Sequence, residues 1–307
     1  MSLFSPEIGL HIGKTLSAIQ VKRQGGRYTI QRYRILEAPH DLIAPSPLEP
    51  NIRDIEQFQK RLKELLYPWE MKKADVALSL PDLAVKVAIF PLESVPKKRE
   101  ELEQLARWRM EQSLLYPLGD VQFSYQLLSR STRMTDGKPS LLTMAIKREI
   151  ITQYEESLKG LGFQPVVVNI ASFHLFNFFH DRLLKTSGPN HCFVVFNIQD
   201  QSFTLMIFQK GMLDFILVKR FMGKDSMDPN GILQALKDSL AFYGERGDAS
   251  TLSHLFLMGE SIDQQLAKQA SAEMNLKTEF MEFNPIASMS APDMAALTPA
   301  LAAGVGI

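Results

Sequence analysis

The sequence has very little cysteine, no net charge and no long hydrophobic run. A single cysteine, Cys192, among 307 residues excludes an intrachain disulfide framework and is typical of a reducing compartment. Lysine plus arginine number 34, and aspartate plus glutamate also number 34, so no bulk charge favours nucleic acid or an anionic membrane. The most apolar segment, 166–179, is too short and too polar to span a bilayer. Because the first residues also show no signal-peptide pattern, we expect a cytoplasmic protein.

A complete phosphate-binding loop is missing as well. Gly13-Lys14-Thr15 has the ending of a Walker A loop, which requires four residues between its first glycine and that ending. Only three residues separate Gly9 from Gly13, and the residues after them favour a strand rather than a helix. Residues 7–37 are therefore predicted to form three strands joined by tight turns, one of them at Gly25-Gly26.

Residues 192–221 repeat the layout of this first segment. A shift of 186 positions aligns the two without a gap and places Ile12 on Ile198 and Gly25 on Gly211. Each copy is followed by an amphipathic helix and an apolar strand, at 54–66 and 74–80, then at 228–243 and 252–259. Two β-β-β-α-β copies predict a pseudo-symmetric α/β protein with a cleft between its halves. Chance similarity between two β-rich stretches is the alternative.

Additional elements lie between the two copies. The pattern predicts a strand at 83–92, a helix at 98–115 with Leu102, Leu105, Ala106 and Arg109 along one side, and a second helix at 149–161. Between these helices, two strands form a hairpin around Asp136-Gly137. This β-α-β-β-α set is large enough to be an inserted subdomain.

The predicted organisation has three parts. Residues 1–82 plus 163–187 form the first half, 83–162 form the inserted subdomain, and 188–307 form the second half. A short helix at 292–303 is expected to close the chain. The helix at 98–115 is most simply a packing element, and lining a groove for a partner peptide is the alternative.

A duplicated β-β-β-α-β core with paired hairpins resembles the actin-like ATPase superfamily, which has a ribonuclease H-like fold and includes actin, the Hsp70 ATPase domain, sugar kinases and FtsA. Within it, the chain resembles the PilM family of type IV pilus assembly. Five segments carry the likeness: IGLHIGKTLSAIQVKR, DVALSLPDLAVKVAIFPL, ARWRMEQSLLYPLGDVQFSYQLL, LGFQPVVVNIASFHLFN and ALTPALAAGVGI.

The resemblance implies a nucleotide cleft whose carboxylates hold Mg²⁺, since this hard cation favours oxygen ligands. In such proteins each phosphate hairpin begins with an aspartate, and a third acid lies on the connecting strand. Here His11, Asn197 and Asn169 stand at those three places. The residues expected at the cleft are His11, Gly13, Lys14, Thr15, Asn169, Asn197, Gln199, Gly259 and Glu260.

Most of these residues depart from what a nucleotide requires. Gly13 is kept, but Gln199 replaces the matching glycine, and the adenosine-contacting glycine pair reads Gly259-Glu260. Lys14 and Thr15 could still hydrogen-bond an anion, and Asp200 could supply a displaced carboxylate. No catalytic residue and no metal site are expected, and ATP with magnesium is the cofactor only if the cleft still binds nucleotide.

The resemblance therefore implies a non-enzymatic scaffold at the cytoplasmic face of the inner membrane. Its partner would be the short cytoplasmic N-terminal peptide of a PilN-like membrane protein, bound between the core and the inserted subdomain, with homo-oligomers as a further option. One alternative is an actin-like protein that binds or hydrolyses ATP. Another is the equivalent component of a type II secretion platform.

Overall fold

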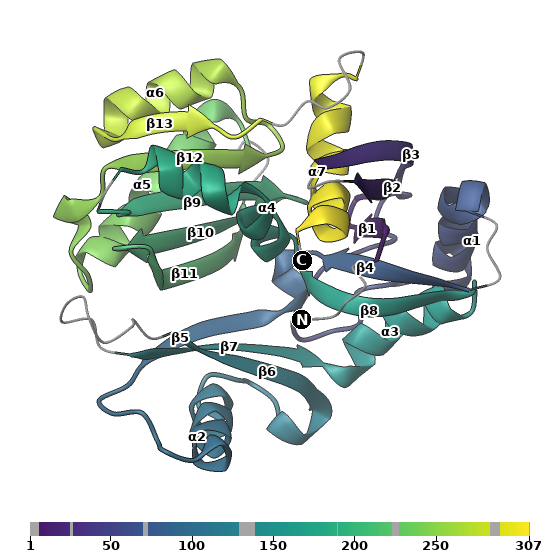
Figure 1. Cartoon of the computed structure of the whole chain (residues 1–307), viewed down its shortest axis with the longest axis horizontal. Helices are drawn as coiled ribbons and strands as arrows, with labels where there is room; N and C mark the ends of the chain where they lie inside the picture. The colour runs from purple at the N-terminus through teal and green to yellow at the C-terminus, as the bar shows by residue number, and fades with distance from the viewer. Residues whose placement is uncertain are drawn as a thin grey trace.

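The computed structural model describes residues 6–24, 27–69, 73–128, 139–188, 190–222, 227–282 and 289–306. Its first sheet has the strand order β3-β2-β1-β4-β8 (Figure 1). These strands are β1 (Ile8–Ile12), β2 (Thr15–Gln24), β3 (Arg27–Glu37), β4 (Ala74–Leu80) and β8 (Phe163–Ile170). The three strands predicted within 7–37 are confirmed, and the turn predicted at Gly25-Gly26 lies outside the described residues.

The second sheet repeats the first in the order β11-β10-β9-β12-β13. Its strands are β9 (Phe193–Gln199), β10 (Ser202–Gln209), β11 (Met212–Arg220), β12 (His254–Gly259) and β13 (Lys277–Phe280). In both sheets the first strand pairs antiparallel with the second and parallel with the fourth. The duplicated α/β fold is therefore confirmed.

The gapless alignment of the two copies is wrong beyond the first turn. In the first hairpin the last pair is Ile12 with Leu16, so three residues form the turn, whereas in the second hairpin Gln199 pairs with Ser202 across only two. The two sheets also share a register shift in the second strand, after Gln20 in one and after Ile207 in the other, and these positions are 187 apart. A single uniform shift cannot describe turns of different length.

Three helices begin at an aspartate cap. In α1 (Ile55–Leu66), α5 (Pro229–Gly244) and α6 (Gln264–Met274), an aspartate side chain accepts a hydrogen bond from a backbone N–H of the first turn. Helix α3 (Arg148–Lys159) and helix α4 (Ala171–Thr186) flank β8 along the chain. Four 3₁₀ turns complete the elements: η1 (Tyr67–Trp69), η2 (Asp82–Ala84), η3 (Leu118–Asp120) and η4 (Ala249–Thr251).

The inserted elements form a separate three-stranded sheet in the order β5-β7-β6. They are β5 (Lys86–Pro91), α2 (Arg99–Glu111), β6 (Val121–Leu128) and β7 (Ser140–Lys147). The predicted helix to residue 115 is too long, because the Ser113 N–H and hydroxyl both turn back to the Met110 carbonyl at 2.8 Å. Met110, not Arg109, lies on the buried face, and the predicted hairpin tip at Asp136-Gly137 lies outside the described residues.

The closing helix α7 (Ala291–Val305) returns to the first sheet. Its Leu297, Ala300 and Leu301 pack with Ile19 and Val21 of β2 in one buried cluster, and in Figure 1 it stands beside β1 and β2. We therefore propose that α7 belongs to the first half by packing, although it follows the second half in sequence. Among the described residues, no helix is long and apolar enough to cross a membrane.

Candidate functional site

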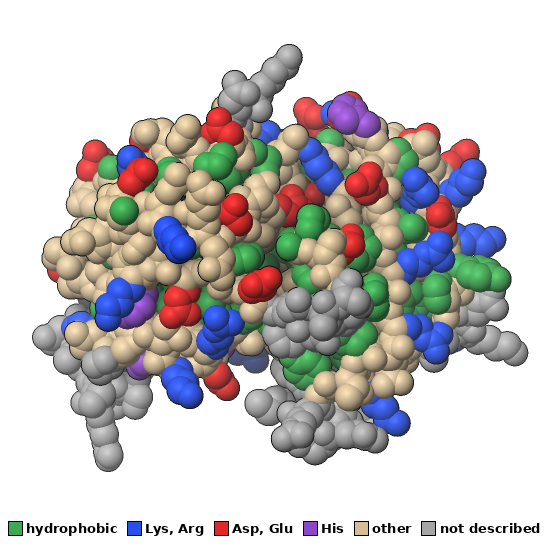
Figure 2. Space-filling view, turned by 90° about the horizontal axis from the view of Figure 1, so that it is seen from above, with side chains coloured by type: hydrophobic (Ala, Val, Ile, Leu, Met, Phe, Trp, Pro, Cys, Tyr) green, Lys and Arg blue, Asp and Glu red, His purple; other side chains and the backbone are tan. Residues whose placement is uncertain are grey.

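A cavity of about 630 Å³ opens where the two halves meet. Figure 2 shows this face, with hydrophobic and acidic side chains around its central hollow. The lining combines the turns of both hairpins, the end of β12, and α4 and α7. The residues are Lys14, Thr15, Leu175, Phe179, Gln199, Met258, Gly259, Glu260, Ser261, Ile262, Asp263, Phe280, Met281, Glu282, Ala291, Pro292, Met294, Ala295, Ala296, Thr298 and Pro299.

Five of the nine residues predicted for the cleft line this cavity: Lys14, Thr15, Gln199, Gly259 and Glu260. The other four do not. His11 and Asn197 lie buried in their strands, and the backbone of Gly13 is covered by Asp200.

Asn169 belongs elsewhere. It lines a smaller cavity of about 160 Å³ between β8 and the inserted sheet, together with Val168 and Phe123, and its Oδ1 accepts from the Ile170 N–H at 2.9 Å. Asn169 therefore lies at the smaller cavity and not among the described residues that line the main one, where it was expected. Asn169 pairs with Ser79 and Ser79 with His11, so the three residues form one row across the sheet, and Asn169 lies at the β8 end of that row.

His11 occupies the place of the first expected carboxylate and is neutral. Its Nδ1 lies 3.1 Å from the Ser79 hydroxyl, and the side chain is buried at the centre of the first sheet. Burial lowers the pKa of His11 to about 4. A neutral imidazole there supplies no negative charge for a divalent cation.

Asn197 stands where the second hairpin is expected to carry its aspartate, and its side chain bonds to a residue of the other half. Its Nδ2 donates to the Ser172 hydroxyl at 2.9 Å. Its Oδ1, like Oε1 of Gln199 and Oδ2 of Asp200, is buried with no hydrogen-bond donor in the described part of the chain. Three buried oxygen acceptors without a donor among the described residues therefore lie near the hairpin turns, which are the expected phosphate-binding position.

Asp82 connects the halves and was missed by the sequence analysis. Its carboxylate accepts from the Ser172 N–H at 3.1 Å, from the Ser172 hydroxyl, and from the Thr204 hydroxyl at 2.5 Å. It thus joins η2, the first turn of α4 and β10. Burial raises the pKa of Asp82, while these hydrogen bonds lower it. The only sequence signal is an acid in the short gap between the strands predicted at 74–80 and 83–92.

Glu260 adds a second carboxyl group at the cavity. Burial, and then the charge of Asp200, raise the pKa of Glu260 to about 7, while the Asp200 backbone N–H donates to it and lowers the pKa. Lys14 is the only basic residue among the described residues that line the cavity. Searching the described ranges finds no group of three histidine, cysteine, aspartate or glutamate side chains placed to hold a metal.

A second hollow, of about 680 Å³, lies between the core and the inserted subdomain. Helix α1, η3, the end of β7 and α3 form its walls. We call it the junction groove and define it by Ile55, Gln59, Asp120, Lys147, Arg148, Glu149, Thr152, Gln153, Glu156 and Ser157.

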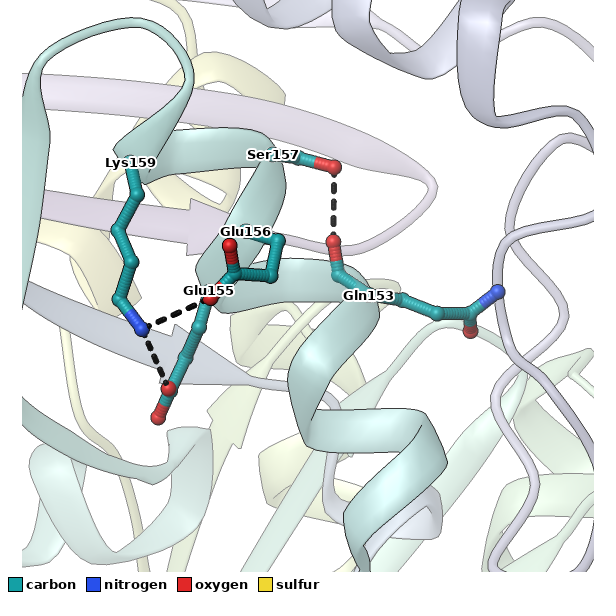
Figure 3. Close-up of polar contacts among 5 residues, drawn as sticks. All are labelled: Gln153, Glu155, Glu156, Ser157 and Lys159. Carbon is teal, nitrogen blue, oxygen red and sulfur yellow. Dashed lines mark hydrogen bonds and ion pairs between the residues drawn. The ribbon is translucent and has the colours of Figure 1, made fainter.

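Helix α3 provides most of the junction groove and is held firmly in place. Figure 3 shows the Gln153 carboxamide directed away from Lys159, which pairs with Glu155 and Glu156 on the other side of the helix. Gln153 Oε1 accepts from the Asn51 N–H at 2.8 Å, and its Nε2 donates to the Ile52 carbonyl at 3.0 Å.

Lys147 strengthens the same junction. Its Nζ donates to the Leu48 carbonyl and lies 5.1 Å from the centre of the Tyr116 ring. Hydrogen bonds therefore tie the groove to the neighbouring loop 48–52, while Thr152 and Glu156 of α3 are exposed.

The comparisons with known proteins agree on the fold. A family model described as "Type IV pilus assembly protein PilM" matches residues 9–229. A PilM–PilN type IV pilus biogenesis complex contains a chain of 20% sequence identity and TM-score 0.77, with 98% of this chain and 97% of that chain covered.

Two further solved structures share the fold at lower identity. One is a Bacteroides thetaiotaomicron protein with an actin-like ATPase fold and unknown function, at TM-score 0.55 and 12% identity over 96% of both chains. The other is the cytoplasmic domain of EpsL, an inner-membrane component of the Vibrio cholerae type II secretion system, at TM-score 0.51 and 9% identity over 96% of this chain and 94% of that chain.

Proposed function

This chain belongs to the PilM family of type IV pilus assembly proteins, and from that premise we propose that it is a non-enzymatic scaffold of the pilus assembly platform. It binds the short cytoplasmic N-terminal peptide of a PilN-like membrane protein and sits through that partner at the cytoplasmic face of the inner membrane. The likeness of its fold to a chain of the PilM–PilN complex supports this choice of partner class.

The observation that carries the proposal is the junction groove. It is an open hollow of about 680 Å³ at the boundary of the inserted subdomain, with a braced floor and an exposed helix along one side. Its lining includes side chains of both charges: Lys147 and Arg148, and Asp120, Glu149 and Glu156. Such a mixed wall can orient a peptide while Ile55 offers apolar contact.

We further propose that the main cleft does not hold ATP. The expected acids are replaced by neutral side chains, and Asp200 covers the backbone of Gly13. A bound phosphate chain would bring its negative oxygens next to three buried oxygens that have no hydrogen-bond donor among the residues that the structure describes, and oxygens repel oxygens. The residues present do not fit a magnesium nucleotide. The cleft instead holds hydrogen bonds that join the two halves.

A groove-blocking substitution tests the partner site. Thr152→Trp places a large ring in the junction groove on an exposed helical surface, and we expect a PilN-like N-terminal peptide to bind at least tenfold more weakly to this variant. Gln104→Trp, on the exposed side of α2, is the matched control and should bind as the wild type does. Equal binding by Thr152→Trp and the wild type would place the peptide elsewhere.

One observation favours the second candidate, an ATP-binding protein. Lys14 and Thr15 line a cavity of about 630 Å³, which is large enough for a nucleotide. Isothermal titration with ATP and Mg²⁺ separates the candidates, because micromolar binding would support the second and heats no larger than dilution would support the scaffold.

The type II secretion alternative rests on the fold likeness to EpsL alone. A panel of cytoplasmic N-terminal peptides from both kinds of system resolves it. We expect the PilN-like peptide to bind, and a preference for a type II secretion peptide would reverse the assignment.

A further inference from the structure

The carboxylate of Asp200 crosses from the second half to the first. Asp200 and Gln201 form the two-residue turn between β9 and β10, with left-handed φ values of 51° and 60°. The Asp200 side chain does not point to solvent, and the residue is only 2% exposed. Its Oδ1 accepts from the Lys14 N–H at 2.6 Å. This bond joins the turn of one hairpin to the turn of the other.

Gly13 is the residue that permits this contact. A methyl group at position 13 would lie 2.8 Å from Oδ1 of Asp200, and Oδ2 would be nearer still. The carboxylate therefore lies directly against the backbone of the first turn. Backbone N–H groups of tight turns are the groups that receive anionic oxygens in phosphate sites.

The surroundings of the Asp200 carboxyl group act on it in opposite directions, and the largest effect is burial. Burial raises the pKa of Asp200, while the hydrogen bond from the Lys14 N–H and the charges of Lys14 and Arg220 lower it. Arg220 also donates to the Pro45 carbonyl at 2.6 Å, which is another bond between the halves. The neighbouring Glu260 is the opposing charge, and it accepts from the Asp200 backbone N–H.

We propose that the carboxyl group of Asp200 occupies the anion-binding backbone of the first turn and clasps the two halves. A phosphate-bearing ligand reaches this turn only after the Asp200 side chain has left it. The inference goes beyond the scaffold function, because it concerns how the turns of the two halves are joined at the cleft rather than what the junction groove binds. The peptide assay can therefore fail while the clasp holds, and the reverse also applies.

A double-mutant cycle tests the contact itself. Gly13→Ala should lower the Tm of the wild type by about 5 °C, since the new methyl group displaces the carboxylate. In the Asp200→Gly background the same change should lower the Tm by less than about 1 °C, because the colliding group is gone and glycine suits the left-handed turn. Equal losses in both backgrounds would overturn the clasp.

A ligand assay tests the consequence. Inorganic tripolyphosphate should bind at least tenfold more tightly to Asp200→Gly than to the wild type, whereas the nearly isosteric Asp200→Asn, whose side chain still fills the turn and keeps the acceptor for the Lys14 N–H, should gain less than Asp200→Gly. Asp238→Asn, an exposed carboxylate of α5, is the control and should behave as the wild type. Tripolyphosphate affinities that are equal in all four proteins would show that Asp200 does not exclude anions.

Discussion

Single buried residues contribute to the contact between the two halves, and Asp82 accepts bonds from Ser172 of its own half and from Thr204 of the other. Removing its carboxylate in Asp82→Ala leaves three buried donors on Ser172 and Thr204 without an acceptor. Each such donor costs about 1–3 kcal/mol, and since neighbouring losses are not additive, we predict a total of about 3 kcal/mol in the free energy of unfolding. Urea unfolding measures this loss.

Asp75→Ala is the matched control for that experiment. Asp75 lies at the exposed beginning of β4, seven residues before Asp82, and its removal should change stability by less than about 0.5 kcal/mol. Equal stabilities for the two variants would mean that the Asp82 network contributes nothing.

Two buried titratable residues near the cleft, His11 and Glu260, are predicted to change the free energy of unfolding with pH in opposite directions. Burial lowers the pKa of His11 to about 4, below its ordinary 6.5, so its stabilising contribution is full above pH 6.5 and is lost as the pH falls to 4. Burial raises the pKa of Glu260 to about 7, so its contribution is full below about 4.5 and is lost as the pH rises through 7. Each is at most about 3 kcal/mol.

Because these contributions oppose one another, variants reveal them better than the wild type. From pH 7 to pH 4, His11→Asn should gain stability relative to the wild type, and Glu260→Gln should lose it. Urea midpoints at four pH values measure both differences. Differences that stay constant with pH would show that neither group titrates between those limits.

At the scale of elements, most strands and helices could be predicted because their signals are local. The strands in 7–37 and 192–221 are rich in apolar, β-branched and aromatic residues and are separated by turn residues, and the helix in 54–66 shows helical periodicity. The short strand β13 was missed, since the four residues Lys277–Phe280 are too few to show a period.

The site itself was only partly predictable. Lys14, Gln199 and Glu260 lie at the cavity because they terminate strands, which sequence order does reveal. The bonds of Asp82 and Asp200 join residues 90 to 186 positions apart, and the unequal turn lengths are invisible in a gapless alignment. Such contacts depend on register, and local propensity carries no information about register.

The packing of α7 on β1 gives a prediction at this scale. A methyl group at Gly9 would collide with the Ala300 carbonyl and would lie 2.7 Å from the Gly304 nitrogen. We predict that Gly9→Ala lowers the free energy of unfolding by about 2 kcal/mol, because helix and strand must separate. Gly119→Ala meets nothing within 4 Å and should be near neutral, and similar losses in both would show that α7 does not press on β1.

At the scale of the whole molecule, three regions have different roles in this account. The two sheets with the same strand order provide a duplicated frame. The two sheets are joined by the bond between Asp82 and Thr204 and by the bond between Asp200 and Lys14. The inserted subdomain then borders a groove whose shape depends on α1 and α3 being held in place. A protein built in this way can present a peptide-binding groove without hydrolysing a nucleotide.

The most direct test of the scaffold proposal is a calorimetric titration of a PilN-like N-terminal peptide into the full chain, with and without millimolar ATP and Mg²⁺, while phosphate release is followed. The account predicts saturable peptide binding, a Kd unchanged within about twofold by the nucleotide, and no phosphate release above the blank. Binding that requires ATP, or release of phosphate that the peptide stimulates, would contradict it.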